Sequence, residues 1–182
     1  MQLAPAILAA LLIVAAIAAI WDLRTRRIPN WLVLAGLVAG FGLNGFLYGL
    51  PGLATAAIGM LTGFGIYLLL HLLRAMGAGD VKFMAAVGSL VGWRDWFHIF
   101  FAAVIVGAIA GLIMAFAKGR LGRTLNNVGY IIWEIGHFRP PHVRREDLDV
   151  KSEKALRLPH GASIAAGIFI LTGWGWWIAR AS

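Results

Sequence analysis

The stretch Arg74–Phe83, RAMGAGDVKF, sets an aspartate, Asp80, behind two closely spaced glycines at the point where a hydrophobic segment begins. A second aspartate, Asp22, follows the first hydrophobic segment, in AAIWDLRTRRIPNWL (residues 18–32). The chain has only eight acidic residues. An acid at the centre of a membrane helix costs about 2.5–3.5 kcal/mol on insertion scales, and less at the boundary. Two acids kept at such positions need an explanation.

The composition identifies the class of protein in which these acids stand. Hydrophobic residues make up 60% of the 182 residues, charged residues make up 13%, and the mean hydropathy is +0.81. Soluble domains have about 25% charged residues. The sequence therefore predicts an integral membrane protein with a single domain, residues 1–182. There is no cysteine, which excludes a disulfide framework and a cysteine-ligated metal within the chain.

Six apolar segments predict the fold class: all-α, a polytopic bundle of six transmembrane helices. The fourth segment has 11 residues and would rise only about 16 Å as a helix, against about 30 Å of hydrocarbon. It must therefore include Gly77–Asp80, or lie in a thinned or protein-lined region. The segments are Ala4–Ile20, Trp31–Tyr48, Leu53–Leu73, Val81–Val91, Phe97–Ala117 and Ser163–Ile178.

Lysine and arginine predict the orientation in the membrane. With six crossings the loops and termini fall into two sets, and one set holds 14 of the 16 cations. Cytoplasmic loops carry the excess of cations, so both termini are expected outside, in a multi-pass protein of the inner (cytoplasmic) membrane. Residues 118–160 form a long cytoplasmic loop between helices five and six, with an interfacial helix expected near Leu125–Ile135. The net charge of +8 thus reflects sidedness, and no nucleic-acid partner is expected.

The same topology brings the two acids together. Two crossings separate Asp22 from Asp80, so both lie on the cytoplasmic side, near the edge of the hydrocarbon. Two adjacent carboxylates can share one proton, the arrangement that aspartic proteases use to hydrolyse a peptide bond. The alternative is that each acid is a boundary residue paired with a cation. That alternative suits Asp22, which has arginines nearby, better than Asp80, because Lys82 would point to another face of a helix.

Residues beside the acids are candidates for substrate binding. Gly77 and Gly79 can adopt backbone angles closed to other residues and let an extended substrate approach the backbone; alternatively, they only break the helix. Lys82, Arg24 and Arg27 can attract an acidic residue of a substrate. Alternatively, these cations are sidedness signals or contact lipid phosphates.

Other polar residues are given structural roles. Pro29 and Asn30 are expected to form a turn and the N-cap of the second helix. His137, His142 and His160 have no spacing that specifies a metal site, so no metal and no cofactor are expected.

Three classes of function remain at this point. The first is an aspartic endopeptidase. The second is a small proton-coupled transporter or channel in which the acids relay ions, although such a path needs polar groups through the whole bilayer depth. The third is a non-catalytic scaffold for assembly of a larger membrane-associated structure, in which the acids would be dispensable.

Three stretches resemble a known family. GAGD at Gly77–Asp80 looks like the GxGD motif of intramembrane aspartic proteases, and MGAGDVKFMAAVG around it resembles the type IV prepilin peptidases. DLRTRRIPNWL at Asp22–Leu32 is similar to the first-aspartate segment of that family. LPHGASIAAG at Leu158–Gly167 resembles the run that opens the last helix in small prepilin peptidases of the tight-adherence (Flp) pilus class.

The resemblance implies a specific activity. Such enzymes remove the basic leader of pilin-like precursors at the cytoplasmic face, with two aspartates as catalytic acids, and Asp22 and Asp80 are the matching positions. Larger members carry paired CxxC sequences in an amino-terminal region and also N-methylate the new terminus. Because this chain has no cysteine and three residues before its first apolar segment, peptidase activity without methylation is expected. The expected partners are a pilin-like precursor and membrane lipids, with homo-oligomerisation left open.

Overall fold

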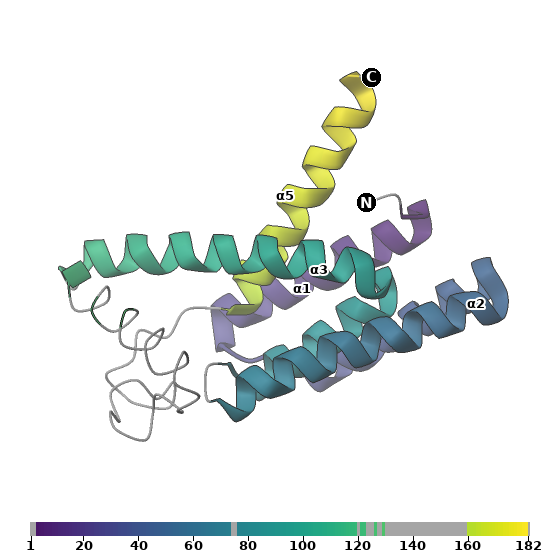
Figure 1. Cartoon of the computed structure of the whole chain (residues 1–182), viewed down its shortest axis with the longest axis horizontal. Helices are drawn as coiled ribbons and strands as arrows, with labels where there is room; N and C mark the ends of the chain where they lie inside the picture. The colour runs from purple at the N-terminus through teal and green to yellow at the C-terminus, as the bar shows by residue number, and fades with distance from the viewer. Residues whose placement is uncertain are drawn as a thin grey trace.

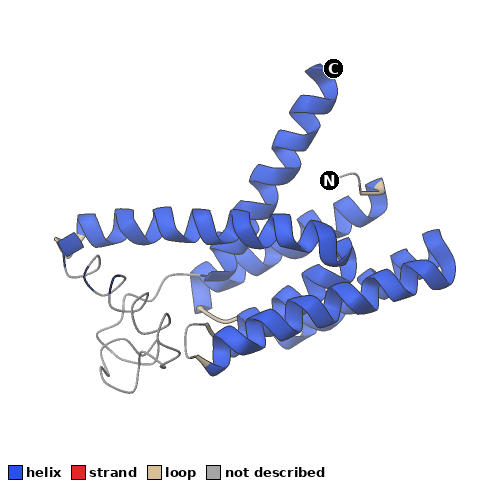
Figure 2. Cartoon of the chain, in the orientation of Figure 1, coloured by secondary structure: helices blue, strands red, loops and turns tan. Residues whose placement is uncertain are grey.

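A computed structural model of the chain describes residues 3–73, 76–119, 121–122, 126, 129 and 160–181, the last eight by backbone only. Every regular element in these ranges is helical: α1 (Pro5–Thr25), α2 (Asn30–Leu72), α3 (Ala78–Ala117) and α5 (His160–Ala181). Figures 1 and 2 show short connections from α1 to α2 and from α2 to α3, with α5 crossing α1 and α3 and then projecting away from them. The all-α class is confirmed for this part of the chain. The expected interfacial helix lies outside the described residues.

Glycine divides the two longest helices. Gly49 in α2 (φ 61°, ψ −142°) and Gly92 in α3 (φ 75°, ψ 170°) have backbone angles that only glycine adopts readily. At each of them the chain reverses direction, so α2 and α3 are helical hairpins. Pro51 lies in the first turn of the second half of α2, where its missing N–H removes no helical hydrogen bond. These reversals separate the apolar segments that were expected from the sequence.

The first half of α3, residues 78–91, is the centre of the bundle. From Asp80 to Val91, every residue except Lys82 is buried. Both halves of α2 pack against this short helix. It starts at Ala78, so it includes Gly79 and Asp80 but leaves Gly77 outside as the N-cap, and it is surrounded by protein, as the second option stated for the short segment requires.

Small residues let these helices approach closely. A methyl group added at Gly59 would overlap the carbonyl of Gly88, and one added at Gly63 would overlap the carbonyl of Met84. On the other side, Gly40 packs against Ser89. Small residues are the usual means of close helix packing in membranes, where burial of apolar surface between helices gains little. The short helix is therefore fixed by backbone contact as well as by side chains.

Asn44 links α2 to α3 by hydrogen bonds. Its buried side-chain amide donates to the carbonyls of Gly40, Ser89 and Leu90 at 2.9–3.1 Å. Interhelical hydrogen bonds of this kind contribute about 0.6–2 kcal/mol each in membranes. They fix the end of the short helix that lies away from Asp80.

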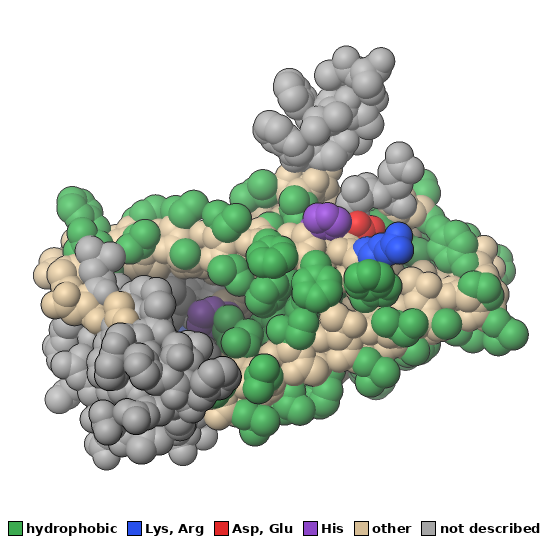
Figure 3. Space-filling model, in the orientation of Figure 1, with side chains coloured by type: hydrophobic (Ala, Val, Ile, Leu, Met, Phe, Trp, Pro, Cys, Tyr) green, Lys and Arg blue, Asp and Glu red, His purple; other side chains and the backbone are tan. Residues whose placement is uncertain are grey.

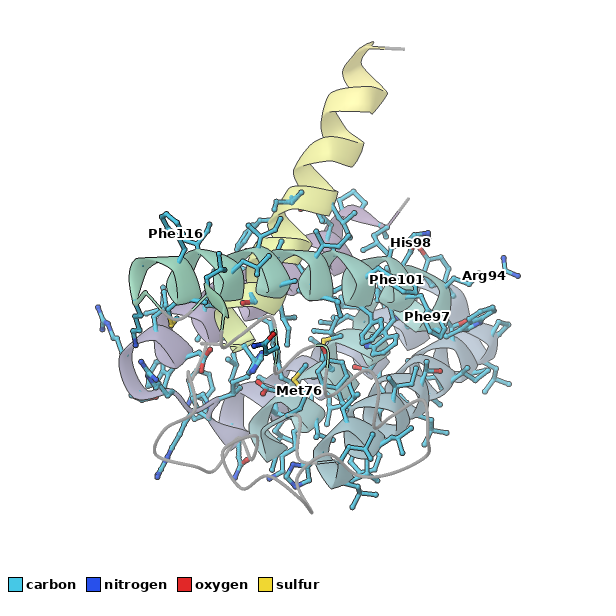
Figure 4. All side chains as sticks on the ribbon, turned by 60° about the vertical axis from the view of Figure 1, so that its left-hand side comes forward. Met76, Arg94, Phe97, His98, Phe101 and Phe116 are labelled. Carbon is cyan, nitrogen blue, oxygen red and sulfur yellow. The ribbon has the colours of Figure 1, made fainter. Side chains whose placement is uncertain are left out.

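The outer surface is that of an integral membrane protein. Three of the described helices, α1, α2 and α3, are long and apolar enough to cross a bilayer, and residues 160–173 of α5 form a shorter apolar helix. Figure 3 shows hydrophobic side chains spread along the visible helices, with a small group of acidic, basic and histidine side chains together at one place. Figure 4 shows Arg94 and His98 at one end of the second half of α3, which follows the Gly92 turn, and Phe116 at its other end. The six crossings, and the external position of both termini, stay predictions.

Candidate active site

Asp22 lies in the last turn of α1, which extends to Thr25 rather than ending before the acid as expected. Its backbone carbonyl accepts the N–H of Arg26, which ends the helix in a left-handed conformation, at 2.8 Å. Its side chain is 6% exposed, and Oδ2 accepts the N–H of Ala162 at 3.1 Å. Ala162 lies in the first turn of α5, so a free N–H of a helix N-terminus binds this carboxylate.

Asp80 lies in the first turn of α3 and is 9% exposed. Its Oδ2 accepts the N–H of Gly77, the residue before the helix, at 3.3 Å. This bond satisfies a donor that the helix leaves free and fixes one oxygen of the carboxylate. Asp80 is thus held by the N-terminus of its own helix, as Asp22 is held by that of α5.

The structure brings these two acids together. Asp80 and Asp22 are near enough to interact electrostatically, although 58 positions separate them in the sequence. His160, the first residue of α5, also interacts electrostatically with Asp80 and is half-buried. A methyl group at Gly161 would lie 3.1 Å from Cβ, Cγ and Oδ2 of Asp22, so the start of α5 packs directly on that acid. Sequence reasoning grouped His160 with scattered surface histidines and missed its position.

Tyr67 is a second residue that sequence reasoning missed. It lies in the second half of α2, is 1% exposed, and interacts electrostatically with Asp80. Its ring makes edge contacts with Trp96 and Phe100, at centroid distances of 6.1 and 6.0 Å. A tyrosine in an apolar run is common in membrane helices, and only the packing of α2 on α3 shows which residue it faces.

The two glycines of the GAGD stretch adopt ordinary backbone angles. Gly77 is extended (φ −77°, ψ 152°) and Gly79 is helical, so the expectation of angles closed to other residues is wrong here. Gly79 does lie against the chain: an added methyl group would be 3.7 Å from the backbone nitrogen of Ile28. Gly77 is exposed, but its N–H donates to Asp80 and its carbonyl accepts the N–H groups of Asp80 and Val81, so its backbone groups are already bonded.

The three candidate cations lie on the surface near the acids. Arg24 and Arg27 are exposed, at the end of α1 and in the following loop. Lys82 is exposed one turn into α3, and its Nζ donates to Oδ1 of Asn30 at 3.2 Å. Asn30 is the first residue of α2 and makes no side-chain cap, because Pro29 takes the N-cap position that was expected for it. In the described ranges no cluster of three or more His, Asp or Glu residues could hold a metal ion.

Comparison with known proteins assigns the chain to a family. Residues 9–112, which include both aspartates, match the model of the type IV leader peptidase family. The chain belongs to this family. No solved structure matches it. The matched region ends at residue 112, well before α5 begins. The assignment to the family therefore does not depend on α5 or on its contacts with the acids.

Curated relatives carry the name prepilin leader peptidase/N-methyltransferase. The protein from Xanthomonas campestris pv. campestris is 35% identical over 106 residues, which are 54% of this chain and 37% of that protein. The protein from Burkholderia pseudomallei (strain 1026b) is 33% identical over 62% of this chain and 37% of its own length. The protein from Neisseria gonorrhoeae is 31% identical over 62% of this chain and 42% of its own. The chain thus spans less than half the length of these relatives.

The contact between Gly161 and Asp22 gives a test of how α5 holds the site. We expect Gly161→Ala to lower the rate of leader cleavage, the activity for which the family is named, by about ten- to a hundredfold. The added methyl group displaces the Asp22 carboxylate, and a misplacement of about 1 Å can cost roughly 10²-fold in rate. The measurement is the cleavage rate of a pilin-like precursor, with thermal stability of the purified protein measured in parallel.

The matched control is Gly173→Ala, on the same helix, where an added methyl group meets nothing within 4 Å. This control should cleave at the parental rate. Equal rates for Gly161→Ala and the parental protein would show that Asp22 does not depend on its contact with α5.

Proposed function

We propose that the protein is an intramembrane aspartic endopeptidase that removes the basic leader from pilin-like precursors at the cytoplasmic face of the inner membrane. The observation that carries the proposal is the pair of buried carboxylates, Asp22 and Asp80, which come from separate helices to one place and are each bound by an N–H at the start of a helix. Membership of the leader peptidase family supports the same reaction class.

The pair fits general acid and base catalysis of peptide hydrolysis. Two adjacent carboxyl groups do not both ionise cheaply, so they hold one proton between them and titrate as a unit. The ionised group takes a proton from a water molecule, which attacks the scissile carbonyl carbon. The protonated group polarises the carbonyl oxygen and then supplies a proton for the leaving amine. No cofactor is needed in this reaction.

The buried polar residues argue against an ion-conducting path. Besides the two aspartates, the buried polar residues of the described chain are Asn44, Ser89 and Ser163. Asn44 donates to backbone carbonyls of α3, and the Ser89 hydroxyl donates to the carbonyl of Ala86 in its own helix. A transporter or channel needs groups along its path that can release and rebind an ion, whereas these two side chains are bound to backbone carbonyls.

The substrate follows from the position of the acids. A pilin-like precursor has a basic leader joined to an apolar helix, so its cleavage site lies at the membrane surface, at the depth where helix ends hold Asp22 and Asp80. Gly77 and Gly79 lack side chains, so an extended leader junction can approach the chain closely beside Asp80. Lys82, Arg24 and Arg27 are exposed near the acids and complement an acidic residue after the cut. We extend the proposal to precursors of the tight-adherence class and to cleavage without N-methylation, on the resemblance of Leu158–Gly167 and the lack of CxxC sequences among these residues.

The first prediction concerns the acids themselves. Asp22→Asn and Asp80→Asn should each lower leader cleavage by about 10²–10⁴-fold or more, because an amide neither accepts nor donates the shared proton. The side-chain shape and the hydrogen bonds from Ala162 and Gly77 are kept by the amide oxygen. The measurement is coexpression with a pilin-like precursor, followed by mass spectrometry of the product, which also distinguishes a free from a methylated terminus.

Asp95→Asn is the matched control, since Asp95 pairs with His98 at 3.5 Å near the Gly92 turn of α3. It should cleave normally. Loss of activity in only one of the two site variants would require a mechanism with a single acid. Full activity in both would favour the scaffold function.

Charge at Lys82 should affect substrate recognition rather than chemistry. We expect Lys82→Glu to raise KM about two- to fivefold for a precursor with an acidic residue after the cut, because exposed ion pairs contribute about 0.2–1 kcal/mol. Lysine at that position of the precursor should restore the parental KM. Lys118→Glu, at the exposed end of α3, is the control. An unchanged KM in Lys82→Glu would remove this residue from the substrate site.

The proposed topology is testable because the chain has no cysteine. Leu50→Cys and Trp93→Cys, exposed beside the two glycine turns, should react with a membrane-impermeant thiol reagent in intact spheroplasts. Thr25→Cys and Lys118→Cys should react only after permeabilisation. The opposite pattern would place the aspartates on the outer face and exclude cleavage at the cytoplasmic side.

A further inference from the structure

The register between α2 and α3 sets Tyr67 opposite Asp80. Gly59 packs on Gly88, and Gly63, one turn later in α2, packs on Met84, one turn earlier in α3. The two helices therefore run antiparallel, with positions matched turn for turn. The next turn of α2 brings Tyr67 to face Asp80, one turn before Met84. In agreement with this register, the Tyr67 phenol and the Asp80 carboxylate are near enough to interact electrostatically.

Aromatic packing fixes the direction of the Tyr67 ring. Its two ring neighbours, Trp96 and Phe100, are stacked on each other at 5.3 Å, and both meet Tyr67 nearly edge-on. Trp96 is itself fixed, since its Nε1 donates to the carbonyl of Met84 at 3.1 Å. These contacts restrict rotation of the Tyr67 ring, whose hydroxyl interacts electrostatically with Asp80.

Among the described residues, neither the Tyr67 hydroxyl nor Oδ1 of Asp80 has a hydrogen-bond partner. Tyr67 is 1% exposed, and within the described ranges no group makes a hydrogen bond to its hydroxyl. In the same ranges, the Asp80 side chain accepts a hydrogen bond from Gly77 at Oδ2, and none reaches Oδ1. Buried tyrosine hydroxyls usually have a partner. The hydroxyl is a donor and Oδ1 is an acceptor, so each can satisfy the other.

We propose that Tyr67 is a positioning residue for Asp80, whose hydroxyl donates a hydrogen bond to Oδ1, directly or through one water molecule. The inference rests on the proposed aspartic peptidase function and adds a third member to that site. With Gly77 on one oxygen and Tyr67 on the other, the Asp80 side chain has a single orientation. Hydrogen bonds of this kind are often long without substrate and shorten in the substrate complex.

This role gives the phenol a function that phenylalanine cannot perform. The ring of phenylalanine would keep the packing against Trp96 and Phe100, but it would leave Asp80 held on one oxygen only. A carboxylate that can rotate spends less time in the orientation that shares a proton with Asp22. Binding of the precursor, which depends on residues at the surface, should be unaffected.

Tyr67→Phe tests the proposal in the full-length protein in detergent or liposomes, with a pilin-like precursor as substrate. We expect kcat to fall about ten- to a hundredfold, as for loss of a hydrogen bond to a charged group, with KM unchanged. We also expect the pH–rate profile to change, since the profile reports the shared proton of the acid pair. Tyr48→Phe, which removes a half-exposed hydroxyl beside the Gly49 turn, should leave both readouts unchanged.

Asp22→Asn and Asp80→Asn, assayed beside it, separate this inference from the proposed function. If both aspartate variants are inactive and Tyr67→Phe has the parental kcat and pH–rate profile, Tyr67 only fills space and the inference is overturned. If the aspartate variants cleave, the peptidase mechanism and the inference fall together. A lower kcat accompanied by a lower thermal stability and an unchanged pH–rate profile would indicate a structural role and would also overturn it.

Discussion

Backbone contact between the second half of α2 and the first half of α3 is the constraint on which the rest of the structure depends. At Gly59 and Gly63 the helices are so close that a single methyl group would collide with a carbonyl of α3. In a bilayer, lipid tails are as apolar as the helix surfaces, so contact between helices must come from close packing and hydrogen bonds. The glycines allow both the close packing and the hydrogen bonds. They fix the short helix along its length and in rotation, and the rotation determines which way Asp80 points.

The second acid depends on a different contact, made at the other end of the sequence. The N-terminus of α5 lies against Asp22, with Gly161 leaving room for the carboxylate and Ala162 donating to it. Glycine is needed at position 161 because a side chain would crowd the Asp22 carboxylate, and not because the backbone there has an unusual angle. The last helix is therefore part of the site, and His160 at its start faces Asp80 while the next residues hold Asp22. A site assembled from α1, α3 and α5 requires all three helix ends to meet.

Features that depend on local sequence were predictable from the amino-acid sequence. Features that depend on the register between packed helices, which decides the residues that face each other, were not. Hydropathy indicated the apolar segments, and parity of crossings indicated that Asp22 and Asp80 lie at the same end. The reversals fall in the gaps expected between apolar segments, at residues 48–53 and 91–97, but whether Gly49 or Gly52 would take the positive φ angle in the first gap was not predictable. The residue that Tyr67 faces was not predictable either. It depends on the register between α2 and α3, and residues of similar hydrophobicity along both helices allow several registers.

Helix ends explain why acids can be buried at this depth. Each carboxylate accepts an N–H from the start of a helix, where backbone donors have no partner within the helix and the helix dipole favours negative charge. Both groups can therefore leave bulk water with a backbone N–H bound to each, while Lys82 and Arg24 are exposed at the surface. An arginine or lysine paired directly with either acid would hold it ionised and prevent the two from sharing a proton. Backbone N–H groups stabilise the acids without carrying a full charge, and His160, which interacts with Asp80, loses its positive charge on deprotonation, so the pair stays available for acid and base chemistry.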